Sequence, residues 1–228
     1  MQGQVVRAVR GDRRNYRPIV SMLCRSSDPV EVARTLCSHC ASQRLYVADL
    51  DALQGGAVQR EVLREILAAL PGLELWLDAG FADAAAAASL RDRLGADAAR
   101  VRIVFGSESL RSSAALEECF GIERRAGETA LLSLDRRGGT RLDAAGCWDT
   151  PALWPAQVIV MTLERVGADA GPDLETLREV QSRSPGTALI GAGGIRHADD
   201  LARARAAGAW AWLVASALHD GRLPAVNR

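Results

Sequence analysis

Short runs of aliphatic and β-branched residues alternate with longer segments of helical periodicity along the whole chain. Eight such runs predict strands, at residues 5–9, 45–49, 73–78, 101–105, 130–135, 157–162, 187–190 and 209–214. Apolar residues at helical spacing predict helices at 29–41, 58–70, 82–94, 110–119, 174–183 and 198–207. Strands that alternate with helices in this way are typical of parallel βα units.

The number of alternations in 228 residues favours one α/β domain over 1–228, a (β/α)8 TIM barrel, with a doubly wound open sheet as the alternative. Internal repetition supports the barrel. The motif at 63–66 recurs at 177–180, an offset of 114 residues, and Gly80 and Gly194 follow strands at the same offset. A repeat of this length indicates two half-barrels, at about 1–114 and 115–228.

The repeat breaks down at the first strand. Asp135 ends the fifth predicted strand, and the following segment contains Gly139, whose best match in the first half is Gly3. The run at 5–9 is then a hairpin arm, and the position equivalent to Asp135 falls two residues before Met1. We therefore expect the first barrel strand to be missing or incomplete, and we interpret Met1 as an internal methionine of a longer reading frame.

Charge and composition narrow the function classes. The 28 basic and 28 acidic residues balance, and no apolar run reaches 18 residues, so neither a nucleic acid nor a membrane is an expected partner. All 28 basic residues are arginine, and the absence of lysine excludes Schiff-base chemistry, covalently held pyridoxal phosphate and a P-loop lysine.

Five cysteines without a secretory signal pattern predict a reduced, cytoplasmic protein. Cys37 and Cys40 form a single CxxC inside a helical pattern, so buried thiols are favoured over a metal or redox site. The three histidines have no partners at metal-ligand spacing. We therefore predict neither a metal nor a cofactor.

Short motifs follow consecutive predicted strands, at residues 46–51, 77–80, 104–107, 134–135, 190–195 and 214–218. In this order the set resembles the histidine-biosynthesis barrels, namely phosphoribosylformimino-aminoimidazole-carboxamide ribotide isomerase (HisA) and the cyclase subunit of imidazole glycerol phosphate synthase (HisF). Residues 7–13 and 165–173 make the chain most similar to a divergent branch found with tetrahydromethanopterin-type cofactor biosynthesis. The resemblance implies acid–base isomerisation of a phosphorylated, ribosyl-type substrate.

The resemblance also implies two phosphate sites, one in each half-barrel. In the second half, Gly193 and Gly194 permit close backbone approach, and Ala215 and Ser216 begin a short helix that would face an anion. The first-half counterparts are Gly80, Gly106 and Ser107, and Ala79 there replaces the equivalent of Gly193, which weakens that site. A purely structural role is the alternative for both sets, because glycines are common at strand-to-helix turns.

Asp135 is the strongest catalytic candidate, because a carboxylate at the mouth of a barrel can act as a general acid or base. A capping or ion-paired aspartate is the alternative. Thr162, at the end of the sixth predicted strand, is a candidate hydrogen-bond donor or else a buried strand threonine. Asp49 is a candidate ligand contact or else a loop anchor.

Two further candidates lie in predicted loops. Arg14, together with Arg13 and Arg17, lies in a loop expected over the mouth, where it is either a phosphate clamp or part of a solvated charged loop. Trp148 follows the fifth predicted strand, where the resembling isomerases stack an aromatic ring on the substrate.

Two departures from the isomerase pattern leave the function open. A strand-one carboxylate is missing, and residues 166–168 read Val-Gly-Ala where the isomerases carry Asp-Gly-Thr. The remaining functions are a ribotide isomerase, a cofactor-biosynthesis enzyme with a different phosphorylated substrate, and a non-catalytic phosphate-binding scaffold. A barrel without one strand would expose two strand edges, which favours a homo-oligomer.

Overall fold

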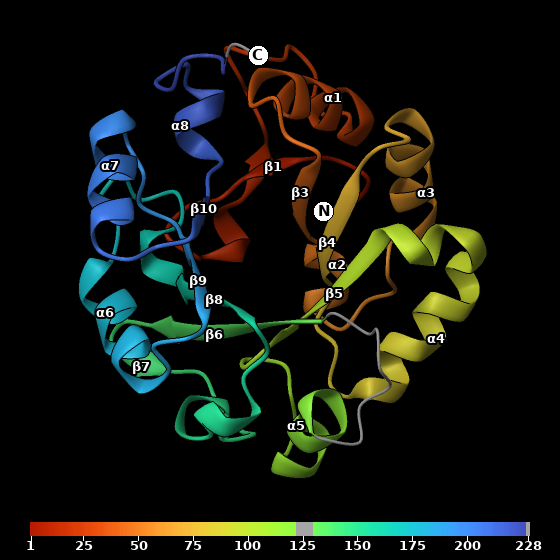
Figure 1. The fold of residues 1–228 in the computed structure, drawn as a ribbon. Coiled ribbons are helices and arrows are strands. Elements are labelled where there is room, and N and C mark those ends of the chain that lie inside the picture. The colour runs from red at the N-terminus through yellow and green to blue at the C-terminus, as the bar shows by residue number, and fades with distance from the viewer. Residues whose placement is uncertain (122–129, 227–228) are drawn as a thin grey trace.

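A computed structural model describes residues 1–121 and 130–226, with parallel strands in the middle and helices around them (Figure 1). The barrel strands, in their order around it, are β3 (Arg44–Ala48), β4 (Glu74–Asp78), β5 (Val101–Gly106), β6 (Leu131–Arg137), β8 (Gln157–Thr162), β9 (Ala188–Ala192) and β10 (Ala211–Leu213). The helices are α1 (Pro29–His39), α2 (Leu50–Leu53), α3 (Arg60–Ala69), α4 (Ala84–Leu94), α5 (Ser113–Phe120), α6 (Leu174–Arg183), α7 (Ala198–Ala206) and α8 (Ser216–His219). Short 3₁₀ segments occur at Arg13–Asn15, Gly95–Arg100, Cys147–Asp149, Pro151–Leu153 and Leu163–Arg165.

The strands follow one another around the barrel in chain order, and every neighbouring pair is parallel. A doubly wound sheet would reverse its order at a switch point, so that alternative is wrong. All seven barrel strands begin and end within two residues of a predicted run. The structure therefore confirms a nearly closed TIM barrel.

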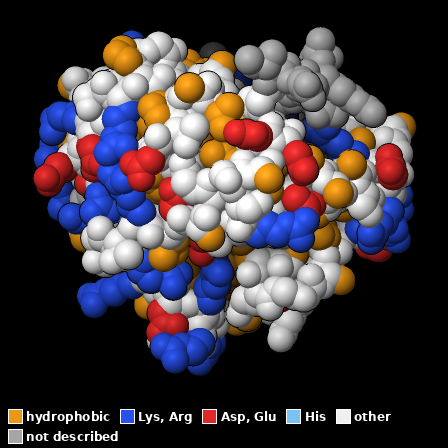
Figure 2. Space-filling model, turned by 90° about the horizontal axis from the view of Figure 1, so that it is seen from below, with side chains coloured by type: hydrophobic (Ala, Val, Ile, Leu, Met, Phe, Trp, Pro, Cys, Tyr) orange, Lys and Arg blue, Asp and Glu red, His pale blue; other side chains and the backbone are white. Residues whose placement is uncertain are grey.

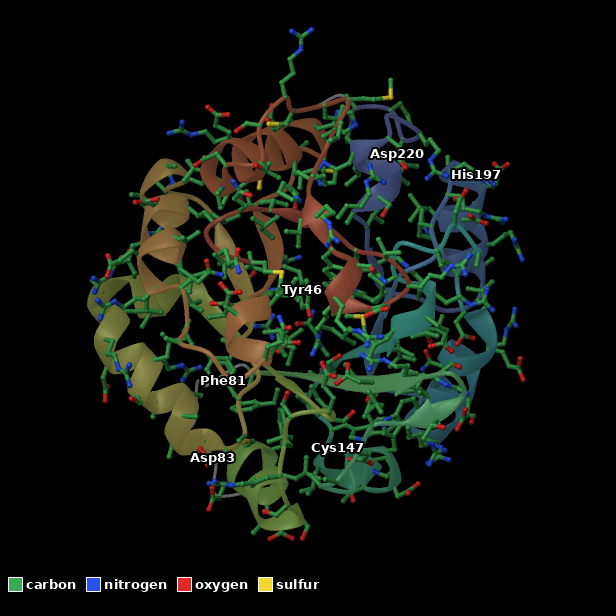
Figure 3. The ribbon with its side chains drawn as sticks, turned by 180° about the vertical axis from the view of Figure 1, so that it is seen from behind. Tyr46, Phe81, Asp83, Cys147, His197 and Asp220 are labelled. Atoms are coloured by element: carbon green, nitrogen blue, oxygen red, sulfur yellow. The ribbon has the colours of Figure 1, made fainter. Side chains whose placement is uncertain are left out.

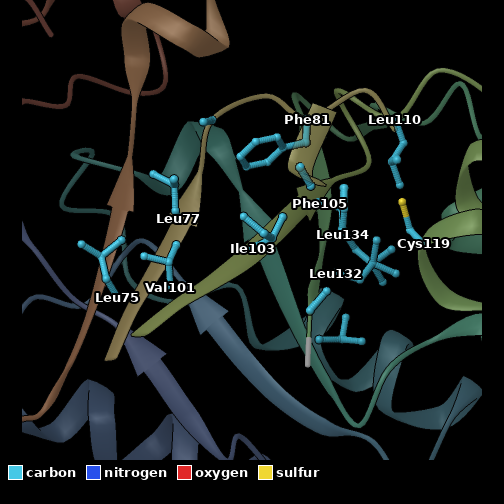
Figure 4. Close-up of a cluster of buried hydrophobic side chains, with 14 of the residues drawn as sticks. Leu75, Leu77, Phe81, Val101, Ile103, Phe105, Leu110, Cys119, Leu132 and Leu134 are labelled. Atoms are coloured by element: carbon cyan, nitrogen blue, oxygen red, sulfur yellow. The ribbon is translucent and has the colours of Figure 1, made fainter. Parts of the chain in front are cut away.

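Side chains point alternately to the two faces of each strand, which divides the core into an inner and an outer layer. On β4, Leu75 and Leu77 pack outward against the helices, whereas Trp76 points into the barrel. Figure 4 shows the outer layer around Ile103 and Phe105 of β5. The barrel interior is filled by Trp76, Val104, Leu131, Ile159, Met161, Ile190 and Ala192.

Polar side chains decide where several helices begin. Asp28 and Asp83 cap α1 and α4, each accepting a backbone N–H from the first turn. Ser112 accepts the N–H of Ala115 in the same way, so α5 begins at Ser113, three residues later than predicted. The other helix ends lie within two residues of the prediction.

The sequence repeat falls on equivalent elements. Leu63 and Ile66 are the buried face of α3, which precedes β4, while Leu177 and Val180 are the buried face of α6, which precedes β9. The repeated motif therefore encodes the same helix-to-barrel contact in each half.

Among the described residues no strand occupies the first position of the barrel, as the sequence indicated. The predicted run at 5–9 contains β1 (Val6–Arg7), which pairs antiparallel with β2 (Arg17–Pro18) and not with the barrel. In Figure 1, β1 lies between β10 and β3. Within residues 1–121 and 130–226, no strand pairs with the outer edge of β3 or of β10. In the second half, β7 (Thr140–Arg141) pairs antiparallel with the end of the barrel strand β6.

The surface carries charges of both signs. Figure 2 shows basic and acidic side chains interspersed over one face. All five cysteines are free thiols, and Cys37 is buried within α1. Among the described residues, no helix has both the length and the apolar character needed to cross a membrane.

Candidate active site

A cavity of about 790 Å³ extends from the carboxyl ends of the barrel strands along the open side between β10 and β3, where residues of α1 and α3 also line it. Tyr46 of β3, Asp78 of β4 and Asp135 of β6 line it, and so do Gly193 and Ser216. Figure 3 places Tyr46 near the middle of the ring of strands, with Asp83 and Asp220 at its periphery. Active sites of TIM barrels are built at this end of the strands, so the cavity is the candidate active site.

Asp135 is buried, and each of its carboxyl oxygens accepts a hydrogen bond. Its Oδ1 accepts the Ser133 hydroxyl at 2.6 Å, and its Oδ2 accepts the backbone N–H of Glu108 at 3.1 Å. Its own N–H donates to Ser107 Oγ at 2.8 Å. These contacts connect the ends of β5 and β6 and fix the carboxyl group inside the barrel.

Asp78 is a second buried carboxyl in the cavity. Its Oδ2 accepts the Tyr46 hydroxyl at 3.1 Å, and its Oδ1 accepts the N–H of Gly80 at 3.2 Å. Asp78 shares the inward face of β4 with Trp76, two residues earlier, because side chains alternate along a strand.

Burial raises the pKa values of Asp78, Asp135 and Tyr46, which face this space. The pKa of Asp78 rises to about 6, first through burial and then through the charge of Glu108. The pKa of Asp135 rises to about 8, first through burial and then through the charge of Asp78. Burial and the charge of Asp78 also raise the pKa of Tyr46. Acid–base groups that titrate near neutral pH are typical of active sites.

One cation reaches the carboxyl groups from the N-terminal segment. Arg13 donates to Glu108 Oε1 at 2.5 Å, and both side chains are largely buried and line the cavity. The charge of Arg13 opposes the rise in the pKa of Asp78. This ion pair ties the loop before β2 to the end of β5.

The second-half candidates lie together at the cavity. Gly193, Gly194, Ala215 and Ser216 all line it. Gly193 and Gly194 have φ values of 82° and 81°, and a Cβ on Gly194 would be 2.1 Å from the Gly171 carbonyl oxygen. Both the backbone conformation and the close packing therefore require glycine at that position.

The first-half candidates hold the local structure. Gly80 has φ 69° and donates its N–H to Asp78, while Ser107 is buried against Asp135. Asp49 lines the cavity, but it caps α2 and accepts both the N–H and the side-chain amide of Gln59, at 2.7 and 3.0 Å. All its described contacts are therefore those of a loop anchor.

Three candidates lie apart from the cavity lining. Arg14 is about nine-tenths exposed and pairs with Asp12. Trp148 is fully buried in the outer core, with the Arg141 guanidinium 5.0 Å from its ring centre. Thr162 is buried and donates its hydroxyl to Asp173 at 2.8 Å.

The sequence pattern did not indicate that Asp78, Tyr46, Arg13 and Glu108 belong to one site. The sequence did contain a signal for Asp78, which ends a strand within the motif at 77–80. It lies two positions after Trp76, so both side chains point to the same face of the strand, which is the inner face of the barrel. Within the described residues, no group of three or more His, Cys, Asp or Glu side chains is placed to hold a metal.

Comparison with known proteins supports a family assignment. The family model described as "Histidine biosynthesis protein" matches residues 1–224. An isomerase from Thermobifida fusca is 30% identical over 86% of this chain and 81% of its own length, and one from Thermomicrobium roseum is 29% identical over 97% and 90%. Both names specify a bis-phosphoribosylated imidazole carboxamide. An uncharacterized protein of Methanocaldococcus jannaschii is 26% identical over 93% of this chain and 87% of its own length. Together with the barrel and its buried carboxyl groups, these matches show that the chain belongs to the histidine biosynthesis protein family.

Proposed function

We propose that the chain is an isomerase that acts by acid–base catalysis on a phosphorylated, ribosyl-type substrate. The observation that carries this proposal is the buried carboxyl of Asp135 at the mouth of the barrel, with a pKa near 8. An aldose–ketose rearrangement moves protons between carbon and oxygen, so it needs a group that can hold or give a proton near neutral pH. The relatives that are named isomerases support the reaction class.

The other end of the cavity supports a phosphorylated substrate. The turn at Gly193 and Gly194 and the beginning of α8 at Ser216 border the cavity that contains Asp135. Glycine turns bring backbone N–H groups close to an anion without a lysine side chain, and this chain contains no lysine. The substrate phosphate would bind there while the reacting carbons lie at the carboxyl groups.

A thermal-shift titration with inorganic phosphate, ribose 5-phosphate and the bis-phosphorylated imidazole ribotide tests the proposal. A ligand at 100 times its Kd stabilises a protein by about 2.7 kcal/mol, so binding is visible without a prior guess at the reaction. We expect the ribotide to raise the Tm more than phosphate does. The Asp135→Asn variant should keep this shift and lose turnover. A ribotide that raises the Tm no more than phosphate would exclude it as the substrate.

A second candidate is an enzyme of tetrahydromethanopterin-type cofactor biosynthesis with a different phosphorylated substrate. The observation that favours it is Val166-Gly167-Ala168, which lines the cavity without the carboxylate that the resembling isomerases carry there. A shift with ribose 5-phosphate or phosphate but none with the ribotide would favour this candidate. Binding of phosphate with no turnover of any phosphorylated sugar would instead favour a non-catalytic scaffold.

A further inference from the structure

Two carboxyl groups from different strands face the same space inside the barrel. Asp78 ends β4 and Asp135 lies near the end of β6, with β5 between these strands. At this level β5 carries Gly106, and a Cβ there would be 2.9 Å from Asp135 Oδ2 and 3.9 Å from Asp78 Oδ2. Both Oδ2 atoms therefore border the volume that a side chain on β5 would fill.

Each carboxyl is anchored so that it stays at this space. Oδ1 of Asp78 is held by the N–H of Gly80, and Oδ1 of Asp135 is held by the hydroxyl of Ser133. The Oδ2 atom of Asp78 takes the Tyr46 hydroxyl and that of Asp135 takes a backbone N–H. The two groups thus have different partners, and so their proton affinities differ.

We propose that Asp78 is the acid–base partner of Asp135, and that the two carboxyl groups hold one proton between them and exchange it with the substrate. This inference rests on the isomerase function proposed above and names its second proton-transfer group. An aldose–ketose isomerisation needs one group that gives a proton and one that takes a proton. Two buried carboxyl groups at one site rarely ionise together, so sharing a proton supplies both.

For an aldosylamine substrate, the proton transfers between the substrate and the two carboxyl groups balance over the reaction. The protonated carboxyl gives its proton to the ring oxygen as the C1–O bond breaks and the nitrogen lone pair forms a C1–N double bond. The ionised carboxyl takes the proton from C2, and the C–H electron pair forms the C1–C2 double bond while the iminium electrons return to nitrogen. The enol hydroxyl then gives its proton to the first carboxylate, and the second carboxyl delivers its proton to C1. The product is the aminoketose, and the pair again holds one proton.

The surroundings indicate which carboxyl gives the proton. Burial and the charge of Asp78 raise the pKa of Asp135 further than burial raises that of Asp78, so the shared proton resides mainly on Asp135 and Asp78 is the base. The charged or titratable groups that line the cavity beside the pair are Tyr46 from β3, Glu108 after β5 and Arg13 from the N-terminal loop. The Cys147 thiol also interacts electrostatically with Asp135, from the outer core. The Tyr46 hydroxyl stabilises the ionised form of Asp78 by donating to it.

A titration of the aspartate carboxyl carbons by ¹³C NMR tests the shared proton without any substrate. In the Asp78→Asn variant we expect the midpoint of Asp135 to fall by about one pH unit or more, because a neighbouring negative charge is removed. Asp83→Asn is the matched control, since it replaces a buried carboxyl that caps α4 outside the cavity lining. It should leave the Asp135 midpoint unchanged. If the titration midpoint of Asp135 is the same in the wild type and in Asp78→Asn, the proposal is wrong.

Kinetics with the ribotide separate this proposal from the proposed function. Loss of a general base lowers kcat by about 100-fold or more, so Asp78→Asn should lower kcat with little change in KM, and Asp78→Glu should restore part of it. If Asp135→Asn is inactive and Asp78→Asn is fully active, the isomerase function stands and the pair is wrong. If the wild-type protein turns over no phosphorylated ribosyl substrate, the proposed function fails, and the NMR midpoint alone decides whether the proton is shared.

Discussion

Replacing Asp135 with asparagine should stabilise the protein at alkaline pH. The folded protein raises the pKa of this carboxyl from about 3.8 to about 8, so the folded state binds its proton more tightly than the unfolded state does. The stability that results from this difference is fully present below the pKa of Asp135 in the unfolded state. It is lost as the pH rises through the pKa of Asp135 in the folded state. Each pKa unit is worth about 1.4 kcal/mol, so the contribution lost between pH 5 and pH 8 is about 4 kcal/mol.

Urea unfolding of both proteins at pH 5, 6, 7 and 8 measures this loss. The free energy of unfolding of the wild type should fall relative to that of Asp135→Asn by up to about 4 kcal/mol over this range, because asparagine has no proton to lose. The Asp83→Asn variant is the control, and it should show no such gain at pH 8, because Asp83 caps α4 and pairs with Arg111. A constant difference between wild type and Asp135→Asn from pH 5 to pH 8 would refute the reasoning.

Two further substitutions test the geometry of the site. Gly106→Ala should lower kcat by more than about 10-fold and the free energy of unfolding by about 1–3 kcal/mol, since the added Cβ would be 2.9 Å from Asp135 Oδ2. Steady-state kinetics measure the first effect and urea unfolding the second. An unchanged kcat would contradict the expected crowding of Asp135. Arg13→Ala should reduce the rise in Tm given by the ribotide, because it removes the cavity cation that pairs with Glu108. Arg14→Ala is the control and should leave this rise unchanged, because the Arg14 side chain extends into solvent. Equal effects of the two substitutions would contradict the assignment of Arg13 to the substrate cavity.

The strands and helices were predictable because each carries its own local pattern. Asp135 was also predictable, since it follows an apolar strand and its burial follows from that position. The groups that surround Asp135 from β4 and β5 were not predictable, because their positions depend on the register between strands. Gly106 is opposite Ser133, and this pairing leaves the space in which the carboxyl groups meet. The burial of Trp148 was not predictable either, since its position after a strand does not reveal that the ring packs in the outer core and not in the cavity.

The open side of the barrel also bears on how the molecule unfolds. A closed ring of strands has no end, but here the described strands form a linear array that begins at β3 and finishes at β10. Opening of such an array starts where a strand has one neighbour, and the backbone amides of the end strands should exchange with solvent first. Asp78 and Asp135 lie on β4 and β6, each paired on both sides. The carboxyl groups are therefore carried by strands that can stay in place while the ends of the array fluctuate.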